Sequence, residues 1–384
     1  MRGHITKRSS DSYTIVISLG TDPVTQKRQQ HWESIKGTKK EAEKRLAELL
    51  HQHDNGNYTK PGKSTVAQFL ERWLADYARA GIAPRSYERY EGIVRSYLIP
   101  SLGSISLVRL KPEHVQGLYG SALEKGLSAK SVNLLHSVLH VALKAAVRWG
   151  LVGRNVADAV DPPRIQRTEM RVWNEDEVTV FLDAAKDSPY YALYYTALFT
   201  GMRRSELLAL KWKDVDLLLC QINVNRGLHR LADGKYIFTE PKSARSRRTI
   251  ALSPSAIPVL RDHQERRKQD FIILGRTLSE EDLVFCRIDG LPLRPNNVTR
   301  TWKVVAKRCG LEPIRLHDAR HTHATLMLKR NVHPKIVQER LGHASIQMTL
   351  DTYSHVAPGI QEAAAKAFDD LFDMNRNPIV LKGE

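Results

Sequence analysis

Leu341 to His355 reads LGHASIQMTLDTYSH, in which a helix-ending glycine is followed by His343 and then by Tyr353. Two polar segments precede it: Leu316 to Thr325 reads LHDARHTHAT, and Thr200 to Leu210 reads TGMRRSELLAL. With one lysine between them, these segments supply two guanidiniums, one ammonium, two imidazoles and one phenol. The site candidates are Arg203, Lys242, His317, Arg320, His343 and Tyr353. Such a set suits a single phosphate group.

Arg203 follows an apolar stretch, Leu193 to Phe199, and a Thr-Gly pair. The residues after it continue as a helix, so the pattern predicts that Arg203 lies near a helix N-terminus, where backbone N–H groups and the helix dipole favour an anion. Its planar guanidinium can donate two parallel hydrogen bonds to phosphate oxygens, which a lysine cannot do.

His317 and Arg320 are three residues apart, so on a helix they would project from one face and contact the same phosphate. A rival interpretation starts from His317 and His321, which have the i,i+4 spacing of metal ligands, with Asp318 and His323 nearby. That set would suit a metal-dependent nuclease. Such sites usually recruit carboxylates, however, and arginines stand here instead, which favours a packing role for His321 and His323.

Lys242 lies in the segment Thr239 to Ile250, TEPKSARSRRTI. We expect a basic turn that joins two β-like runs, Lys235 to Phe238 and Arg248 to Leu252, into a hairpin. A lysine at its tip could reach the minor groove and protonate a leaving 5′ oxygen. The alternative is a simple phosphate-binding patch, since three arginines share the turn: Arg245, Arg247 and Arg248.

The three quoted segments resemble the sequence boxes of the tyrosine recombinases, the phage-integrase family. The resemblance is dense over the last half of the chain, and the upstream segments look like the accessory domains of that family in the same order. It implies a site-specific DNA recombinase that integrates and excises a mobile element, with Tyr353 as the nucleophile of a 3′-phosphotyrosine intermediate.

The resemblance also implies how the other five candidates act. They would stabilise the negative charge of the transition state without a metal ion or a cofactor. Strands would be rejoined through a Holliday junction, and because one phosphoester replaces another, no ATP is expected. The chain accordingly contains no G-x-x-x-x-G-K-[ST] phosphate loop.

Composition agrees with a nucleic-acid partner. The chain has 384 residues, enough for two or three domains, and 59 Lys+Arg against 42 Asp+Glu give a net charge of +17. No apolar run is long enough to span a membrane and no signal peptide is evident, so we expect a soluble cytoplasmic protein of a bacterial host. The three cysteines are widely spaced and predict neither a disulfide framework nor a zinc site.

The predicted fold is multidomain and mainly α-helical with β-inserts. The sequence of residues 1–60 predicts a three-stranded sheet plus one helix. This small α+β unit resembles the family's arm-type DNA-binding domain. Residues 63–162 pattern as four helices and resemble the SAM-like core-binding domain. Residues 170–384 form the expected catalytic domain, mainly α with a β-insert. The segments 55–64 and 161–171 read as linkers.

The amphipathic pattern of Gly359 to Phe372 predicts a C-terminal helix. It could pack on its own domain, whereas the resemblance implies docking on a neighbouring subunit and a homotetramer on double-stranded DNA with core and arm sites. An excisionase and a DNA-bending host protein are further expected partners, and a membrane is not. An inactive DNA-binding regulator would share the charge and the helices, but it would not need all six candidates.

Overall fold

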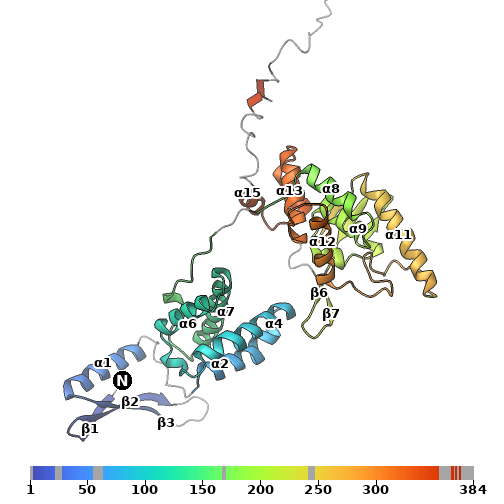
Figure 1. Ribbon diagram of the computed structural model, residues 1–384. Coiled ribbons are helices and arrows are strands. Elements are labelled where there is room, and N and C mark those ends of the chain that lie inside the picture. The colour runs from blue at the N-terminus through green and yellow to red at the C-terminus, as the bar shows by residue number, and fades with distance from the viewer. Residues whose placement is uncertain are drawn as a thin grey trace, which may run out of the picture. The chain divides into compact units, whose positions relative to one another are not determined.

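The computed structural model describes residues 3–21, 28–54, 64–166, 170–240 and 247–353, together with 365–366, 368–369 and 372. The chain divides into two compact units, Met1–Arg167 and Thr168–Glu384 (Figure 1). The division falls within the proline-containing segment 161–171, which was expected to be a linker.

The first unit opens with an antiparallel sheet in the order β1-β2-β3, as predicted. Its strands are β1 (Gly3–Ser9), β2 (Ser12–Thr21) and β3 (Arg28–Lys36). Because alternate residues point to opposite faces, Ile15 and Ile17 are buried together and pack with Leu49 of helix α1 (Lys39–Asp54). Trp32 lies in register with Val16, on the face away from Ile15, and is 60% exposed.

The rest of this unit is helical and encloses its own apolar core, in which Trp73 stacks near Tyr77 and Tyr90. Two of its α-helices continue directly into a π-helical segment. The second of these segments, Val94–Leu98, ends two residues before Pro100, which has no N–H to donate to the preceding turn. The segments are α2 (Val66–Arg72), η1 (Trp73–Ala78), α3 (Arg79–Gly81), α4 (Pro84–Ile93), η2 (Val94–Leu98), α5 (Ile99–Leu102), η3 (Leu107–Arg109), α6 (Pro112–Glu124), α7 (Ala129–Arg148) and η4 (Val156–Ala159).

The second unit is mainly α-helical. Its helices are α8 (Glu175–Ala185), α9 (Tyr191–Thr200), α10 (Arg204–Leu208), α11 (Ala256–Ile273), α12 (Pro295–Arg308), α13 (Ala319–Lys329), α14 (Pro334–Leu341) and α15 (Ile346–Tyr353). Short 3₁₀ turns, η5 (Trp212–Asp214) and η7 (Leu316–Asp318), connect some of them. Within the described ranges, no helix has both the length and the apolar character needed to cross a membrane.

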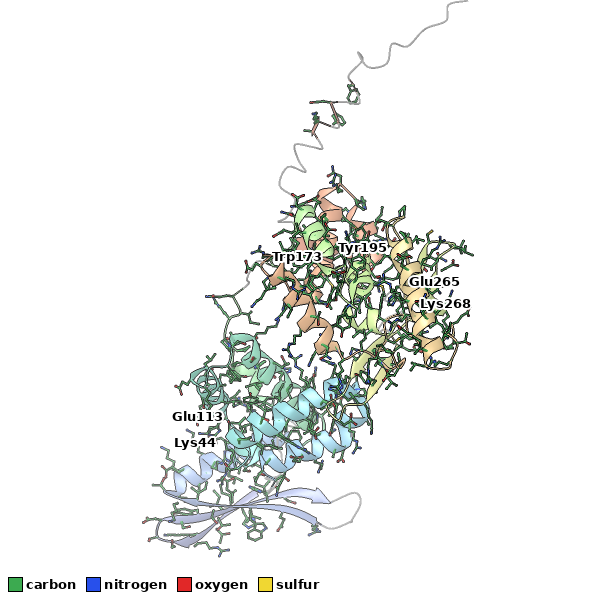
Figure 2. All side chains as sticks on the ribbon, turned by 45° about the vertical axis from the view of Figure 1, so that its right-hand side comes forward. Lys44, Glu113, Trp173, Tyr195, Glu265 and Lys268 are labelled. Carbon is green, nitrogen blue, oxygen red and sulfur yellow. The ribbon has the colours of Figure 1, made fainter. Side chains whose placement is uncertain are left out.

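Aromatic side chains fill the centre of the second unit. The Trp173 and Trp302 rings stack with centroids 5.1 Å apart, and Phe181 lies 4.2 Å from Trp302. Trp173 lies among the helices of this unit (Figure 2). Its indole N–H donates to the Glu312 carbonyl at 3.2 Å, and that of Trp302 donates to the Ile314 carbonyl at 2.9 Å. These buried polar atoms are therefore satisfied, as a stable core requires.

The β-insert differs from the predicted hairpin. Strand β7 (Tyr236–Thr239) pairs with β6 (Gly227–Arg230), whereas β8 (Arg248–Ala251) joins β5 (Gln221–Val224) and β4 (Val215–Asp216). The two runs expected to pair with each other therefore belong to different sheets. Each has a better partner: β8 places Ile250 opposite the buried Ile222, and β7 places Phe238 opposite the buried Leu228.

Candidate active site

The turn between α9 and α10 holds Arg203. Gly201 ends α9 with a left-handed backbone (φ 65°), and Arg203 directly precedes α10, as the sequence predicted. The Arg203 Nη1 donates to Glu206 Oε1 at 2.7 Å, and its Nη2 donates to the Gly342 carbonyl at 3.4 Å. This half-buried guanidinium therefore connects the turn to the residue before His343.

Arg320 reaches the same turn from another helix. It lies in the first turn of α13, is only 3% exposed, and donates from Nη1 to the Gly201 carbonyl at 2.9 Å. The carbonyl that Arg320 binds is two residues before Arg203. One short stretch of backbone, residues 201–203, therefore carries one arginine of the predicted clamp and supplies the carbonyl that the other arginine binds.

His317 is positioned somewhat differently from the prediction. It belongs to the 3₁₀ turn η7, one step before α13, so His317 and Arg320 do not share one continuous α-helix. They are still electrostatic neighbours: the surrounding protein and then the Arg320 charge lower the pKa of His317. The His317 ring packs edge to face against His321, with centroids 5.7 Å apart.

His343 is buried at the junction of α14 and α15. Gly342 ends α14 in the left-handed region (φ 66°), and the chain then turns so that His343 Nδ1 lies 2.8 Å from Thr349 Oγ1. Burial, followed by the charges of Arg320 and Arg203, lowers the pKa of His343 to about 3. The imidazole is therefore neutral at neutral pH and lies close to both arginines.

Helix α15 leads from this histidine to the predicted nucleophile. Tyr353 is the last residue of α15, one turn after Thr349. Its side chain is not among those that the structure describes. Lys242 also falls outside them, in the segment 241–246. Among the described side chains, the structure brings together Arg203, His317, Arg320 and His343.

Sequence reasoning missed an ion pair behind this cluster. Arg248 donates from Nη2 to Glu206 Oε2 at 2.8 Å and from Nη1 to Oε1 at 3.2 Å, and both side chains are buried. Although burial opposes ionisation, the Arg248 guanidinium and then Arg203 lower the pKa of Glu206 to about 2. Glu206 therefore stays ionised between two arginines.

The alternative interpretation of this segment placed Arg248 in a phosphate-binding patch, and the structure corrects it for this residue. Its Nε donates to the Arg340 carbonyl at 2.7 Å, so the whole guanidinium is used inside the protein. The sequence did carry a signal for Glu206: an acid three residues after Arg203 at a helix start has capping spacing, and the Arg203 backbone N–H donates to Glu206 Oε2 at 2.8 Å. No pattern of neighbouring residues in the sequence indicated that Glu206 pairs with Arg248.

His323 has the packing role that the sequence favoured. Its Nδ1 lies 2.9 Å from the Leu198 carbonyl, and Arg340 Nε donates to its Nε2 at 3.0 Å. Burial first, and then the Arg340 charge, lowers the pKa of His323 to about 3. Both ring nitrogens are thus engaged, which leaves none for a metal ion. No group of three or more His, Cys, Asp or Glu side chains within the described ranges could hold one.

The sequence of this chain is similar to those of known integrases. Residues 171–359 match the phage integrase family, and residues 65–121 match the phage integrase N-terminal SAM-like domain. An integrase of Streptomyces ambofaciens is 30% identical over 348 residues, covering 87% of each chain. The ICEBs1 integrase of Bacillus subtilis is 29% identical over 369 residues, covering 96% of this chain and 99% of the relative.

Solved structures show the same fold. A Tn1549 transposon integrase in complex with circular intermediate DNA superimposes with a TM-score of 0.64, at 22% identity, over 79% of this chain and 99% of that one. A lambda integrase tetramer bound to a Holliday junction gives 0.56, at 20% identity, over 89% and 95%. Given these matches, the chain belongs to the phage integrase family and is a tyrosine recombinase, an enzyme that breaks and rejoins DNA.

Proposed function

We propose that this recombinase integrates and excises a mobile element at specific DNA sites, with Arg203, Lys242, His317, Arg320, His343 and Tyr353 as its catalytic residues. One observation carries the assignment. Arg320 binds the Gly201 carbonyl, Arg203 binds the Gly342 carbonyl, and His343 contacts Thr349 of α15. These three hydrogen bonds, joined by the backbone of residues 201–203 and 342–343, thus connect the proposed clamp to the helix that ends in Tyr353.

The proposed first step exchanges one phosphoester for another. The Tyr353 phenolic oxygen attacks the scissile phosphorus, forms a 3′-phosphotyrosine and displaces the 5′ oxygen of the next nucleotide. Lys242 donates the proton that this leaving oxygen needs, and neutral His317 accepts the phenolic proton. A 5′-hydroxyl from a partner duplex then reverses the reaction, so the joining step requires no external energy source.

Charge stabilisation falls to the two arginines and His343. Arg203 and Arg320 donate to the non-bridging oxygens, where negative charge grows in the transition state. In the tautomer in which the Thr349 hydroxyl donates to Nδ1 of His343, the ring proton resides on Nε2 and can be donated to the same phosphate. A lowered pKa does not prevent this role, because a neutral imidazole still has one N–H.

The relatives suggest the assembly. The lambda integrase structure is a tetramer on a Holliday junction, and the Tn1549 integrase is bound to DNA. We propose a homotetramer on duplex DNA, joined by trans docking of the expected C-terminal helix, Gly359 to Phe372, most of which lies outside the described residues. In its support, Phe368 and Phe372 are 63% and 67% exposed, with ring centroids 5.1 Å apart. We further propose an excisionase, a DNA-bending host protein and action in the bacterial cytoplasm.

The three domains are proposed with their roles. Residues 1–60 would bind arm sites, residues 63–162 would bind the core site, and residues 170–384 would perform the chemistry. The sheet β1-β2-β3 supports the first role because its Trp32 face is not the one packed on α1, and a three-stranded sheet fits the major groove.

A recombination assay in cells tests this function. Two plasmids would carry the DNA that flanks the gene and its uninterrupted counterpart, and PCR would score the new junctions. We expect junctions with the parent protein and none with Tyr353→Phe. Recombination by Tyr353→Phe at the parental level would contradict the assigned nucleophile.

A further inference from the structure

Arg340 contacts three separate segments of the second unit with one guanidinium. It lies near the end of α14 and is half-buried. Its Nε donates to His323 Nε2 at 3.0 Å, its Nη1 donates to the Ala251 carbonyl at 2.9 Å, and its Nη2 donates to the Phe199 carbonyl at 2.9 Å. These partners lie 17, 89 and 141 residues away in the sequence, so the three hydrogen bonds join distant parts of the chain.

Two of these partners lie within four residues of the proposed arginine clamp. Phe199 is in the last turn of α9, four residues before Arg203. His323 is in α13, three residues after Arg320. Because Arg340 binds both partners, it ties the end of one helix to the start of another, and these two places hold the two arginines of the clamp.

The other contacts of Arg340 reach the remaining parts of the site. Ala251 is the last residue of β8, the strand that follows the segment with Lys242. Arg340 itself precedes His343 by three residues, and its own carbonyl accepts a hydrogen bond from Arg248 Nε at 2.7 Å. One side chain thus connects the four parts of the chain that carry or adjoin the proposed catalytic residues.

The His323 ring is in the tautomer that this contact requires. Its Nδ1 lies 2.9 Å from the Leu198 carbonyl, which can only accept, so Nδ1 carries the ring proton and Nε2 has the lone pair. Arg340 Nε, which can only donate, meets that lone pair. Burial and then the Arg340 charge lower the pKa of His323 to about 3, so the ring keeps this neutral form at neutral pH.

We propose that Arg340, acting with His323, is a positioning residue that holds the arginine clamp, the lysine segment and the helix of Tyr353 in one arrangement. Its three nitrogens donate to acceptors within the protein, so it acts through these segments. A planar guanidinium suits this task because its donors point in fixed, divergent directions, whereas a lysine has one ammonium on a flexible chain. The inference rests on the proposed function, since it concerns the geometry of the same site.

Cleavage of two related substrates tests the inference. The full-length parent, Arg340→Met, Arg340→Lys and His323→Phe would each cleave a core-site duplex that carries either the normal scissile phosphate or a methylphosphonate there. Reactions would be single-turnover over a series of protein concentrations, which separates the cleavage rate constant from DNA affinity. Arg267→Met is the matched control, because Arg267 forms an ion pair with Asp270 on α11, a helix that carries none of the proposed catalytic residues.

The ratio between the two substrates isolates the positioning role. A methyl group replaces one charged oxygen in the methylphosphonate, so its cleavage depends less on the arginine clamp. A variant that is merely less folded would lose amplitude equally on both substrates, whereas a misplaced clamp would slow cleavage of the phosphate more than cleavage of the methylphosphonate.

We expect Arg340→Met to cleave the phosphate at least about 100-fold more slowly than the parent, with DNA affinity within about threefold. Its loss on the methylphosphonate should be about tenfold or less. Arg340→Lys should recover part of the rate, and His323→Phe, which removes one of the three acceptors, should lose about tenfold on the phosphate. Arg267→Met should cleave both substrates within about threefold of the parent.

Two failures are distinguishable. If Arg340→Met cleaves the phosphate as fast as the Arg267→Met control, or loses the same factor on both substrates, Arg340 does not position the clamp, and the proposed function stands. If Arg340→Met does not fold, His323→Phe decides the matter by the same ratio. A parent protein that cleaves no phosphate duplex would contradict the proposed function itself.

Discussion

Glu206 joins Arg203 of the proposed clamp to Arg248 behind it. It is buried and accepts hydrogen bonds from Arg203 and Arg248. Its folded-state pKa of about 2 lies below the ordinary value of 4.5, so its ionisation stabilises the native state above pH 4.5 and this contribution is lost as the pH falls towards 2. The difference corresponds to roughly 3 kcal/mol.

Glu206→Gln should therefore be less stable than the parent by about 3 kcal/mol near neutral pH, because it leaves the buried Arg248 and the half-buried Arg203 without a counter-charge. The gap between the two proteins should shrink as the pH is lowered through 4.5. Urea unfolding of both chains, near neutral pH and near pH 3, measures it. A gap that does not change with pH would show that Glu206 is not ionised between the arginines.

Arg203 and Arg320 make a second prediction at this scale. A lysine keeps the charge but cannot donate two parallel hydrogen bonds or reach the same carbonyls, so Arg203→Lys and Arg320→Lys should each slow strand cleavage by at least about 100-fold. DNA binding should stay within about 1 kcal/mol of the parent. Single-turnover cleavage of a core-site duplex gives the rates.

Arg204→Lys is the matched control for this series. Arg204 is the next residue in the chain, and its Nη1 donates to Thr299 Oγ1 at 2.8 Å, outside the proposed clamp. We expect its cleavage rate to remain within about tenfold of the parent. Equal losses in all three variants would mean that the two assigned arginines have no special role.

At the scale of elements, the glycine after α9 sets how closely the parts of the site approach. Gly201 has φ +65°, and a Cβ there would lie 2.6 Å from Leu341 Cδ2 and 2.9 Å from His323 Cδ2. Gly201→Ala should thus combine backbone strain with overpacking and cost about 2 to 5 kcal/mol of unfolding free energy. Cleavage should fall as well, because Arg320 binds the Gly201 carbonyl.

Gly310→Ala separates the two causes. Gly310 has a similar backbone, φ +75°, but nothing lies within 4 Å of the added Cβ. It should lose only about 1 to 2 kcal/mol, the cost of the left-handed backbone, and cleave at nearly the parental rate. Thermal or urea unfolding with cleavage assays measures both variants, and equal effects at the two glycines would refute the steric argument.

Elements with strong local signals could be predicted from the sequence. The helix start at Asn174 followed from the acids behind it, and the structure shows the capping box: Glu177 N–H donates to Asn174 Oδ1 at 2.8 Å, and Asn174 N–H donates to Glu177 Oε2 at 2.9 Å. The strands of the first sheet and the position of Arg203 before a helix were likewise confirmed. Each rests on residues close together in the chain.

Long-range pairings could not be predicted in the same way. Strand β8 was assigned to β7 because the two are neighbours in sequence, yet it pairs with β5, where Ile222 and Ile250 share a buried face. The Arg248–Glu206 pair was not predicted for the same reason, since its members lie 42 residues apart in the sequence. Local patterns report which face is apolar, but not which distant strand or carboxylate will meet it.

At the scale of the whole molecule, removal of residues 1–60 should separate two activities. The truncated chain should still cleave a core-site duplex within about tenfold of the parent, because the proposed catalytic residues all lie in the second unit. Integration in the plasmid assay should be lost, because arm sites would no longer be bound. Intact integration, with no DNA bound by residues 1–60 alone, would contradict the arm-binding role.

The most direct measurement is a covalent-adduct assay in EDTA. The parent and Tyr353→Phe would be incubated with nicked duplexes taken from the DNA flanking the gene, and denaturing gels would resolve any protein joined to DNA. The account predicts a band that is stable to heat and detergent with the parent, and none with Tyr353→Phe, although both proteins bind the duplex. Cleavage without a band, restored only by added metal, would instead indicate a nuclease, and binding by the parent without cleavage would indicate an inactive regulator.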